Sequence, residues 1–179
     1  MRCFIALDLP REAIKRIEEI QELIQKKNLF IGKFTESENL HLTLKFLGEI
    51  SEEQVQEARK KLQEIKFNEF DASLGEVGVF SKRSLKIVWV KLNGKGVFDL
   101  QEKIDRVLSD LFQPETRFMG HITIARVKKV FDKETLVKYL KDIKIKDLKF
   151  KTDKFFLKKS DLKPEGPTYE DLLEVSAEK

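Results

Sequence analysis

The 179-residue chain is long enough for one sizeable core, and its hydrophobic content of 41%, including 14 Phe, excludes a disordered protein. Its 35 Lys and Arg outnumber its 31 Asp and Glu by only four, which permits a phosphate-bearing partner without indicating one. No apolar run approaches the ~20 residues of a spanning helix, and the start lacks a secretory cleavage site. We therefore expect a cytoplasmic protein that does not engage membranes.

The first half of the chain is expected to alternate strands with amphipathic helices. A helix is predicted to begin at Pro10, a residue suited to a first helical turn, and another follows Ser51 and Gln54, which form a capping-box pattern. Cys3, the only cysteine, excludes an internal disulfide and a cysteine-based zinc site, and we expect it to be buried. The three strands are expected at residues 3–7, 40–47 and 70–80.

The second half repeats the same order. A turn is expected at Asn93 and Gly94, and Asp132 is placed to cap a helix that carries Leu136 and Leu140. The strands are expected at residues 86–92, 121–127 and 148–157, with a helix at 100–111 and a last strand at 169–175.

The repeated order predicts one α+β domain over residues 1–179. It would consist of two lobes, about residues 1–80 and 86–160, related by an approximate twofold axis, together with a C-terminal strand.

The two histidines of the chain lie in matching tetrapeptides. His41 is followed by Leu-Thr-Leu and His121 by Ile-Thr-Ile, so both follow the pattern His-x-Thr-x with apolar residues at x. Side chains two apart on a strand share a face, so each histidine projects with its threonine, Thr43 or Thr123, while the apolar residues face the core. A twofold axis would bring these four polar side chains to one cleft.

Two facing imidazoles suit concerted acid–base catalysis. One enters neutral and takes a proton from water, and the other enters protonated and gives a proton to the leaving oxygen. The hydroxyls of Thr43 and Thr123 are suited to hold anionic oxygens between them.

Other interpretations of these residues are less well supported. A single strand histidine is usually structural, but a matched pair favours function. A metal site needs three or four converging ligands, and neither tetrapeptide contains Asp, Glu or Cys, so we expect neither a metal nor another cofactor. A serine nucleophile would need an elbow motif, which neither Ser81 nor Ser84 has.

The sequence resembles the two-histidine phosphoesterases, and specifically the bacterial and archaeal RNA 2′,3′-cyclic phosphodiesterases, long called 2′-5′ RNA ligases. The resemblance covers essentially the whole chain. The stretches that carry it are MRCFIALDLP, NLHLTLKFLGEI, HITIARVK and SDLKPEGPTYEDL.

This resemblance implies a bilobal fold with antiparallel sheets lining a central cleft and helices outside. It implies that His41 is the proton donor and His121 the proton acceptor in metal-independent hydrolysis of a 2′,3′-cyclic phosphate to a 2′-phosphate. The expected partner is RNA with such an end, tRNA fragments included, and the expected state is a monomer. Joining of RNA ends through a 2′-5′ linkage would be a side activity.

Two residues at matching offsets from the histidines complete the candidate site. Arg126 and Phe46 each lie five residues after a histidine, which strict alternation would place on the opposite face. A bulge would return both to the cleft, where Arg126 would hold a phosphate and Phe46 would stack a base. Lys45 shares the face of His41 by alternation and is expected either to add positive potential there or to be solvated.

Two rival functions remain open. A non-catalytic RNA-end-binding protein needs similar groups, although binding alone would favour Arg or Lys over a largely neutral histidine. RNA ligation as the main role would have to use the energy of the cyclic phosphate, because the sequence shows no nucleotide-binding lysine motif of an ATP-driven ligase.

Overall fold

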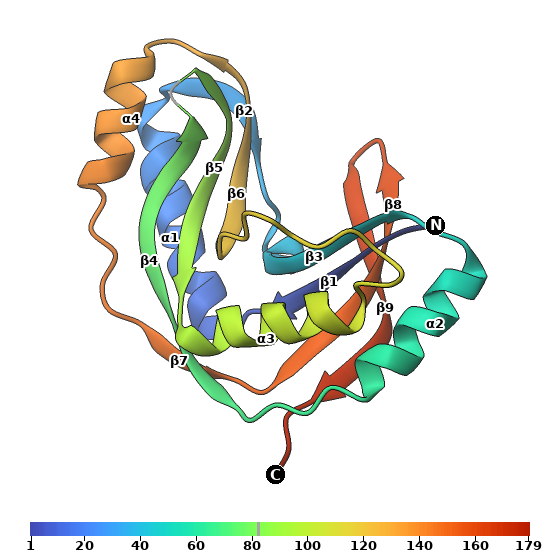
Figure 1. The fold of residues 1–179 in the computed structure, drawn as a ribbon. Coiled ribbons are helices and arrows are strands. Elements are labelled where there is room, and N and C mark those ends of the chain that lie inside the picture. The colour runs from blue at the N-terminus through green and yellow to red at the C-terminus, as the bar shows by residue number, and fades with distance from the viewer. Residues whose placement is uncertain (82) are drawn as a thin grey trace.

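Nine antiparallel strands form one strongly curled sheet in a computed structural model that describes residues 1–81 and 83–179 (Figure 1). The strands are β1 (Arg2–Asp8), β2 (Phe30–Phe34), β3 (His41–Glu49), β4 (Phe70–Ser81), β5 (Ser84–Asn93), β6 (His121–Val130), β7 (Lys149–Thr152), β8 (Lys154–Lys163) and β9 (Gly166–Ser176). The helices are α1 (Arg11–Lys27), α2 (Glu52–Gln63), α3 (Lys95–Val107) and α4 (Lys133–Asp142), and Ser37–Asn39 forms a 3-10 turn, η1.

The strand order is β7-β4-β5-β6-β3-β1-β8-β9, with β2 paired to β6 beside the main path. Strands β3 and β6 therefore lie at the middle of the sheet, with β1, β8 and β9 beyond β3, and β5, β4 and β7 beyond β6. The two halves of the chain interleave in space, because β2 pairs with β6 and β8 pairs with β1. The division into repeated halves stays a prediction about sequence order.

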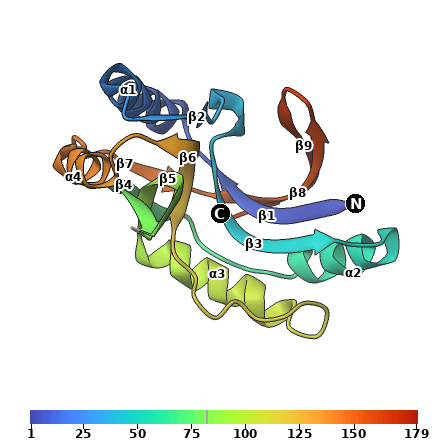
Figure 2. The ribbon, with the colours of Figure 1, turned by 90° about the horizontal axis from the view of Figure 1, so that it is seen from above.

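The helices lie outside the curl of the sheet, as the view from above shows (Figure 2). Helix α3 contacts β3 and β4, α4 contacts β4, α1 contacts β6, and α2 contacts α3 and β9. Helix α2 begins with the predicted capping box, in which Ser51 and Gln54 bond each other's backbone, and Asp132 caps α4 through the Thr135 amide. None of the described helices is long and apolar enough to cross a membrane.

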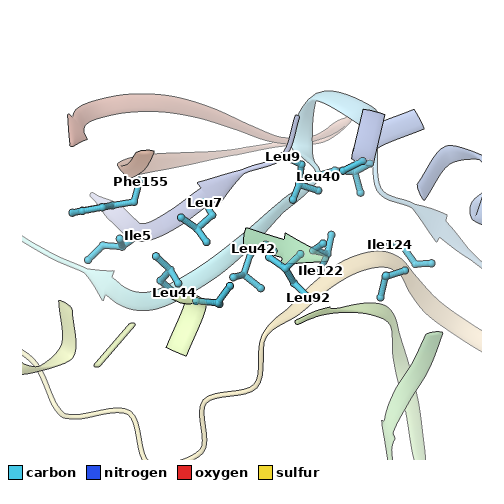
Figure 3. Close-up of a cluster of buried hydrophobic side chains, with 14 of the residues drawn as sticks. Ile5, Leu7, Leu9, Leu40, Leu42, Leu44, Leu92, Ile122, Ile124 and Phe155 are labelled. Carbon is cyan, nitrogen blue, oxygen red and sulfur yellow. The ribbon is translucent and has the colours of Figure 1, made fainter. Parts of the chain in front are cut away.

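The core fills the space between the sheet and the helices. Leu42, Leu44, Ile122 and Ile124, the apolar residues of the two tetrapeptides, are all buried, and Figure 3 shows them packed among residues from β1, β5 and β8. The predicted alternation therefore holds across both motifs. Cys3 is also buried on β1, as expected, and burial raises the pKa of its thiol.

The α+β class is confirmed and the predicted elements occur in the predicted order, but two local expectations are corrected and one strand was not predicted. Residues 148–157 are not one strand: β7 pairs with β4, whereas β8 pairs with β1 in another part of the sheet. The buried positions shift from Phe150 and Thr152 to Phe155 and Leu157, so the alternation loses its phase at Asp153. Strand β2 was not predicted from the sequence, and α3 ends at Val107, before Leu111.

Candidate active site

The two histidine-bearing strands meet at a single residue pair. Leu42 of β3 lies opposite Ile122 of β6, and both side chains are fully buried. Because each residue stands between the histidine and the threonine of its motif, the four polar side chains project from the other face of the sheet on either side of this pair. One cleft of about 530 Å³ is lined by His41, Thr43, His121 and Thr123 together.

Matching bulges in β3 and β6 bring two further residues to the same cleft. Against β1, Thr43 and Lys45 have partners in the register and Leu44 is skipped. Against β5, Thr123 and Ala125 have partners and Ile124 is skipped. Each bulge inverts the alternation after it, so Phe46 and Arg126 both line the cleft. The expected bulge is therefore present in both strands.

The first bulge also corrects the expectation for Lys45. Its side chain is 3% exposed, so it neither shares the face of His41 nor reaches solvent. It forms an ion pair with Asp105 of α3 and donates a hydrogen bond to the Gln113 carbonyl oxygen at 2.7 Å. Because Leu44 is skipped in the register, the Lys45 side chain points inward, where its ammonium bonds Asp105 and the Gln113 carbonyl.

The two imidazoles are held in the same way. His41 donates from Nδ1 to the Asn39 carbonyl oxygen at 2.7 Å, and His121 donates from Nδ1 to the Met119 carbonyl oxygen at 2.9 Å. In each case the acceptor lies two residues before the histidine. These bonds fix the tautomer and leave Nε2 of each ring for chemistry in the cleft. Nε2 of His41 also lies 3.1 Å from the Thr43 hydroxyl oxygen.

The surroundings of the two rings differ. The His41 ring packs against Phe4 and Tyr169, with centroids 5.0 and 5.2 Å away. The His121 ring meets the edge of Phe80 at 4.8 Å, and Phe80 is half exposed. Burial lowers the pKa of His41 below its ordinary value, and the hydrogen bond to the Asn39 carbonyl partly offsets this.

Cleft-lining residues outside the tetrapeptides come mainly from β1, β2 and the β8–β9 hairpin. Tyr169 lies in the C-terminal stretch SDLKPEGPTYEDL. The resemblance to the family included this stretch, but it did not predict that Tyr169 lines the cleft. Phe4 and Asn39 likewise lie in the stretches MRCFIALDLP and NLHLTLKFLGEI, but strand patterning does not show which distant strand lies beside a histidine. In residues 1–81 and 83–179, no three His, Cys, Asp or Glu side chains are grouped where they could hold a metal ion. The further lining residues are Arg2, Phe4, Lys33, Phe34, Thr35, Glu36, Asn39, Ser160, Leu162, Pro164, Gly166, Pro167 and Tyr169.

Comparison with known proteins agrees with this arrangement. The model of the LigT like Phosphoesterase family matches residues 7–89 and 91–169. A protein of Methanocaldococcus jannaschii named RNA 2′,3′-cyclic phosphodiesterase is 33% identical, over 97% of this chain and 99% of its own length. A protein of Thermotoga maritima with the same name is 34% identical, over 99% of this chain and 96% of its own.

Solved structures show the same fold. A crystal structure of a Thermus thermophilus protein superposes with a TM-score of 0.79 at 26% identity, covering 98% of this chain and 97% of that one. The apo form of Escherichia coli LigT gives a TM-score of 0.78 at 22% identity, covering 99% and 98%. With both sequence motifs placed in one cleft and the family model spanning nearly the whole chain, this protein belongs to the LigT-like phosphoesterases.

Proposed function

We propose that this chain hydrolyses terminal 2′,3′-cyclic phosphates of RNA to 2′-phosphates, with His41 as proton donor and His121 as proton acceptor. The observation that carries the proposal is the shared cleft, in which both His-x-Thr pairs and Arg126 line one cavity. Membership of a phosphoesterase family and relatives named for this activity support the reaction class.

The reaction places the phosphorus between the two Nε2 atoms. A water oxygen attacks phosphorus while its proton passes to Nε2 of His121, and the bond from phosphorus to O3′ breaks as Nε2 of His41 protonates O3′. The products are a 2′-phosphate and a free 3′-hydroxyl. Each histidine ends in the protonation state with which the other began, and exchange with solvent restores both.

Three polar side chains are suited to the anionic oxygens of the reacting group. The hydroxyls of Thr43 and Thr123 project beside the histidines, and Arg126 supplies a guanidinium on the same face. Donors already in position for the charge that develops on phosphorus lower the barrier without reorganisation. The Thr43 hydroxyl, 3.1 Å from Nε2 of His41, lies where it contacts both the proton donor and a phosphoryl oxygen.

The nucleoside next to the phosphate is assigned to the aromatic part of the cleft. Phe46 is 65% exposed although it is a large apolar residue, and its ring lies 6.3 Å from that of Phe4. An exposed ring in a site of this kind is suited to stack a base without selecting its identity. The proposed partner is RNA with a cyclic phosphate end, including tRNA fragments, bound by a single copy of the chain.

The decisive experiment identifies the product. RNA ending in a 2′,3′-cyclic phosphate is incubated with the protein in the presence of EDTA, and the product isomer is determined. We expect a 2′-phosphate, formed with chelator present. His41→Ala and His121→Ala should each reduce turnover ~10²–10⁴-fold with the fold intact. Tight binding without turnover would identify an RNA-end-binding protein, and loss of activity on chelation, restored by Zn²⁺ or Mg²⁺, would point to a metal enzyme.

A further inference from the structure

The two histidines share a motif and a mode of anchoring, yet the charges beside them are opposite. On the neighbouring strand β1, Asp8 lies opposite His41 in the register. On the neighbouring strand β5, Lys91 lies opposite His121. Asp8 and Lys91 therefore occupy equivalent register positions with opposite charges, and Lys91 also lies 4.0 Å from the Glu76 carboxylate.

Asp8 belongs to a cluster of three charged side chains, defined here as Asp8, Lys158 and Asp171. The Nζ of Lys158 lies 3.1 Å from the Asp8 carboxylate and 2.6 Å from the Asp171 carboxylate. Lys158 is 7% exposed, and its ammonium lies over the Phe156 ring, 4.7 Å from the centroid. This lysine is therefore fixed in place, and it holds Asp8 in turn.

The cluster shares a cavity with His41. All three of its residues line a second cavity, of about 450 Å³, together with His41 and Tyr169. This cavity adjoins the catalytic cleft, because His41, Asn39 and Tyr169 border both. The cluster holds two carboxylates and one ammonium, and the ammonium of Lys158 influences the pKa of His41 more strongly than the Asp8 carboxylate does.

We propose, on the basis of the function proposed above, that Asp8 is a positioning residue that favours the protonated form of His41, the proposed proton donor, and that Lys158 opposes this effect. A nearby carboxylate favours imidazolium and a nearby ammonium disfavours it. Each charge acts on the pKa of His41 in the expected direction: Lys158 lowers it, and Asp8, whose influence is the smaller of the two, raises it.

Several other titratable or charged groups face His41 and remain constant in the test. They come from the strands around the cleft and from the segment before β3, and they are His121, Tyr169, Glu36, Glu38, Arg2, Lys33 and Arg126.

The test uses two substitutions with opposite expected effects. Asp8→Asn removes a negative charge and should lower the pKa of His41, whereas Lys158→Met removes a positive charge and should raise it. Because the chain has only two histidines, labelled-histidine NMR titration of the free protein follows both rings, and His121→Ala assigns the signals. A neighbouring charge typically moves such a midpoint by roughly one pH unit. We expect opposite shifts of that order for His41 and smaller ones for His121.

A matched control separates electrostatics from loss of a buried ion pair. Lys45→Met breaks the buried pair with Asp105, on the opposite face of the sheet, and should leave the His41 midpoint unchanged. Thermal unfolding of all three variants shows which remain folded at the temperature of the titration. Shifts in the same direction for Asp8→Asn and Lys158→Met, or equal shifts in Lys45→Met, would overturn the proposal.

Kinetics then link the titration to the donor role. The falling limb of kcat/KM for RNA with a cyclic phosphate end should move to lower pH in Asp8→Asn and to higher pH in Lys158→Met. If the NMR midpoints move but the limb does not, His41 is not the donor and the proposal fails. If the protein does not open cyclic phosphates at all, the proposed function fails, while the NMR titration still reports whether the cluster controls His41.

Discussion

Leu42 lies opposite Ile122 where β3 and β6 meet, and this buried pair fixes the distance between the two His-x-Thr motifs. A substitution at this pair should affect both the stability of the fold and the alignment of β3 with β6. Leu42→Ala should lower the free energy of unfolding by ~2–5 kcal/mol, as for other fully buried leucines. It should also lower kcat at a temperature where the variant is folded, because the two imidazoles no longer hold a fixed separation.

Leu136→Ala is the matched control for this prediction. Leu136 is fully buried in α4, outside the cleft lining, so it should have a similar cost in stability without a fall in kcat. Chemical denaturation and steady-state kinetics on both variants provide the comparison. An equal fall in kcat for the two would show that stability alone, not the alignment of β3 with β6, controls the rate.

Arg126 should contribute through a charged hydrogen bond to the phosphate. Such bonds typically provide roughly 1.5–3 kcal/mol, so Arg126→Gln should lower kcat/KM ~10–100-fold. Lys129→Gln removes the same charge from an exposed position on the same strand and should have little effect. Comparable losses in the two variants would mean that Arg126 acts only through the overall positive potential.

Phe46 should contribute through base stacking. Stacking of a base on an aromatic side chain is typically worth ~1–3 kcal/mol, so Phe46→Ala should weaken kcat/KM for RNA by roughly 5–100-fold. A substrate that lacks the terminal base should lose little in the same variant. Phe131→Ala, which removes an exposed Phe outside the cleft lining, should change neither substrate. An equal loss on the abasic substrate would contradict the stacking role.

The sequence was sufficient to predict the α+β class, most elements and the four polar residues of the motifs, because alternation along a strand is a local property. It left Phe46 and Arg126 undecided, since a bulge depends on the register with a neighbouring strand, which no local pattern shows. Lys45 was misplaced for the same reason. Asp8 is adjacent to His41 only through pairing of β1 with β3, so its position could not be predicted from either strand alone.

The pH dependence should reflect the lowered pKa of His41. The proposed mechanism requires His41 to be protonated, so activity is lost as pH rises through its pKa. Burial lowers that pKa in the free protein, so the falling limb of kcat/KM should lie below the ordinary histidine value of 6.5. Bound cyclic phosphate is an anion that favours imidazolium, so the falling limb of kcat should lie at higher pH. Coincident limbs for kcat and kcat/KM would contradict this prediction.

The last prediction separates the two histidines by what each does to the reacting bonds. The substrate is an RNA end whose cyclic phosphate carries sulfur in place of O3′, so that the departing group is a thiolate and needs little help from an acid. On this substrate the loss caused by His41→Ala should shrink greatly, because the missing proton is no longer required. The loss caused by His121→Ala should persist, since water still has to give up a proton as it attacks phosphorus.

The comparison is made as the ratio of kcat/KM for the sulfur and oxygen substrates in the original protein and in each variant. A rise in this ratio confined to His41→Ala supports the assigned roles. Selective rescue of His121→Ala would reverse the assignment of donor and acceptor. Equal rescue of both would mean that each histidine acts at the leaving oxygen, or that both act by positioning the phosphate.

Since Nε2 of His41 lies 3.1 Å from the Thr43 hydroxyl, Thr43→Val should be compared with the two histidine variants on both substrates. Its rate loss should be the same on both substrates, because that hydroxyl is proposed to hold a phosphoryl oxygen rather than to supply the proton.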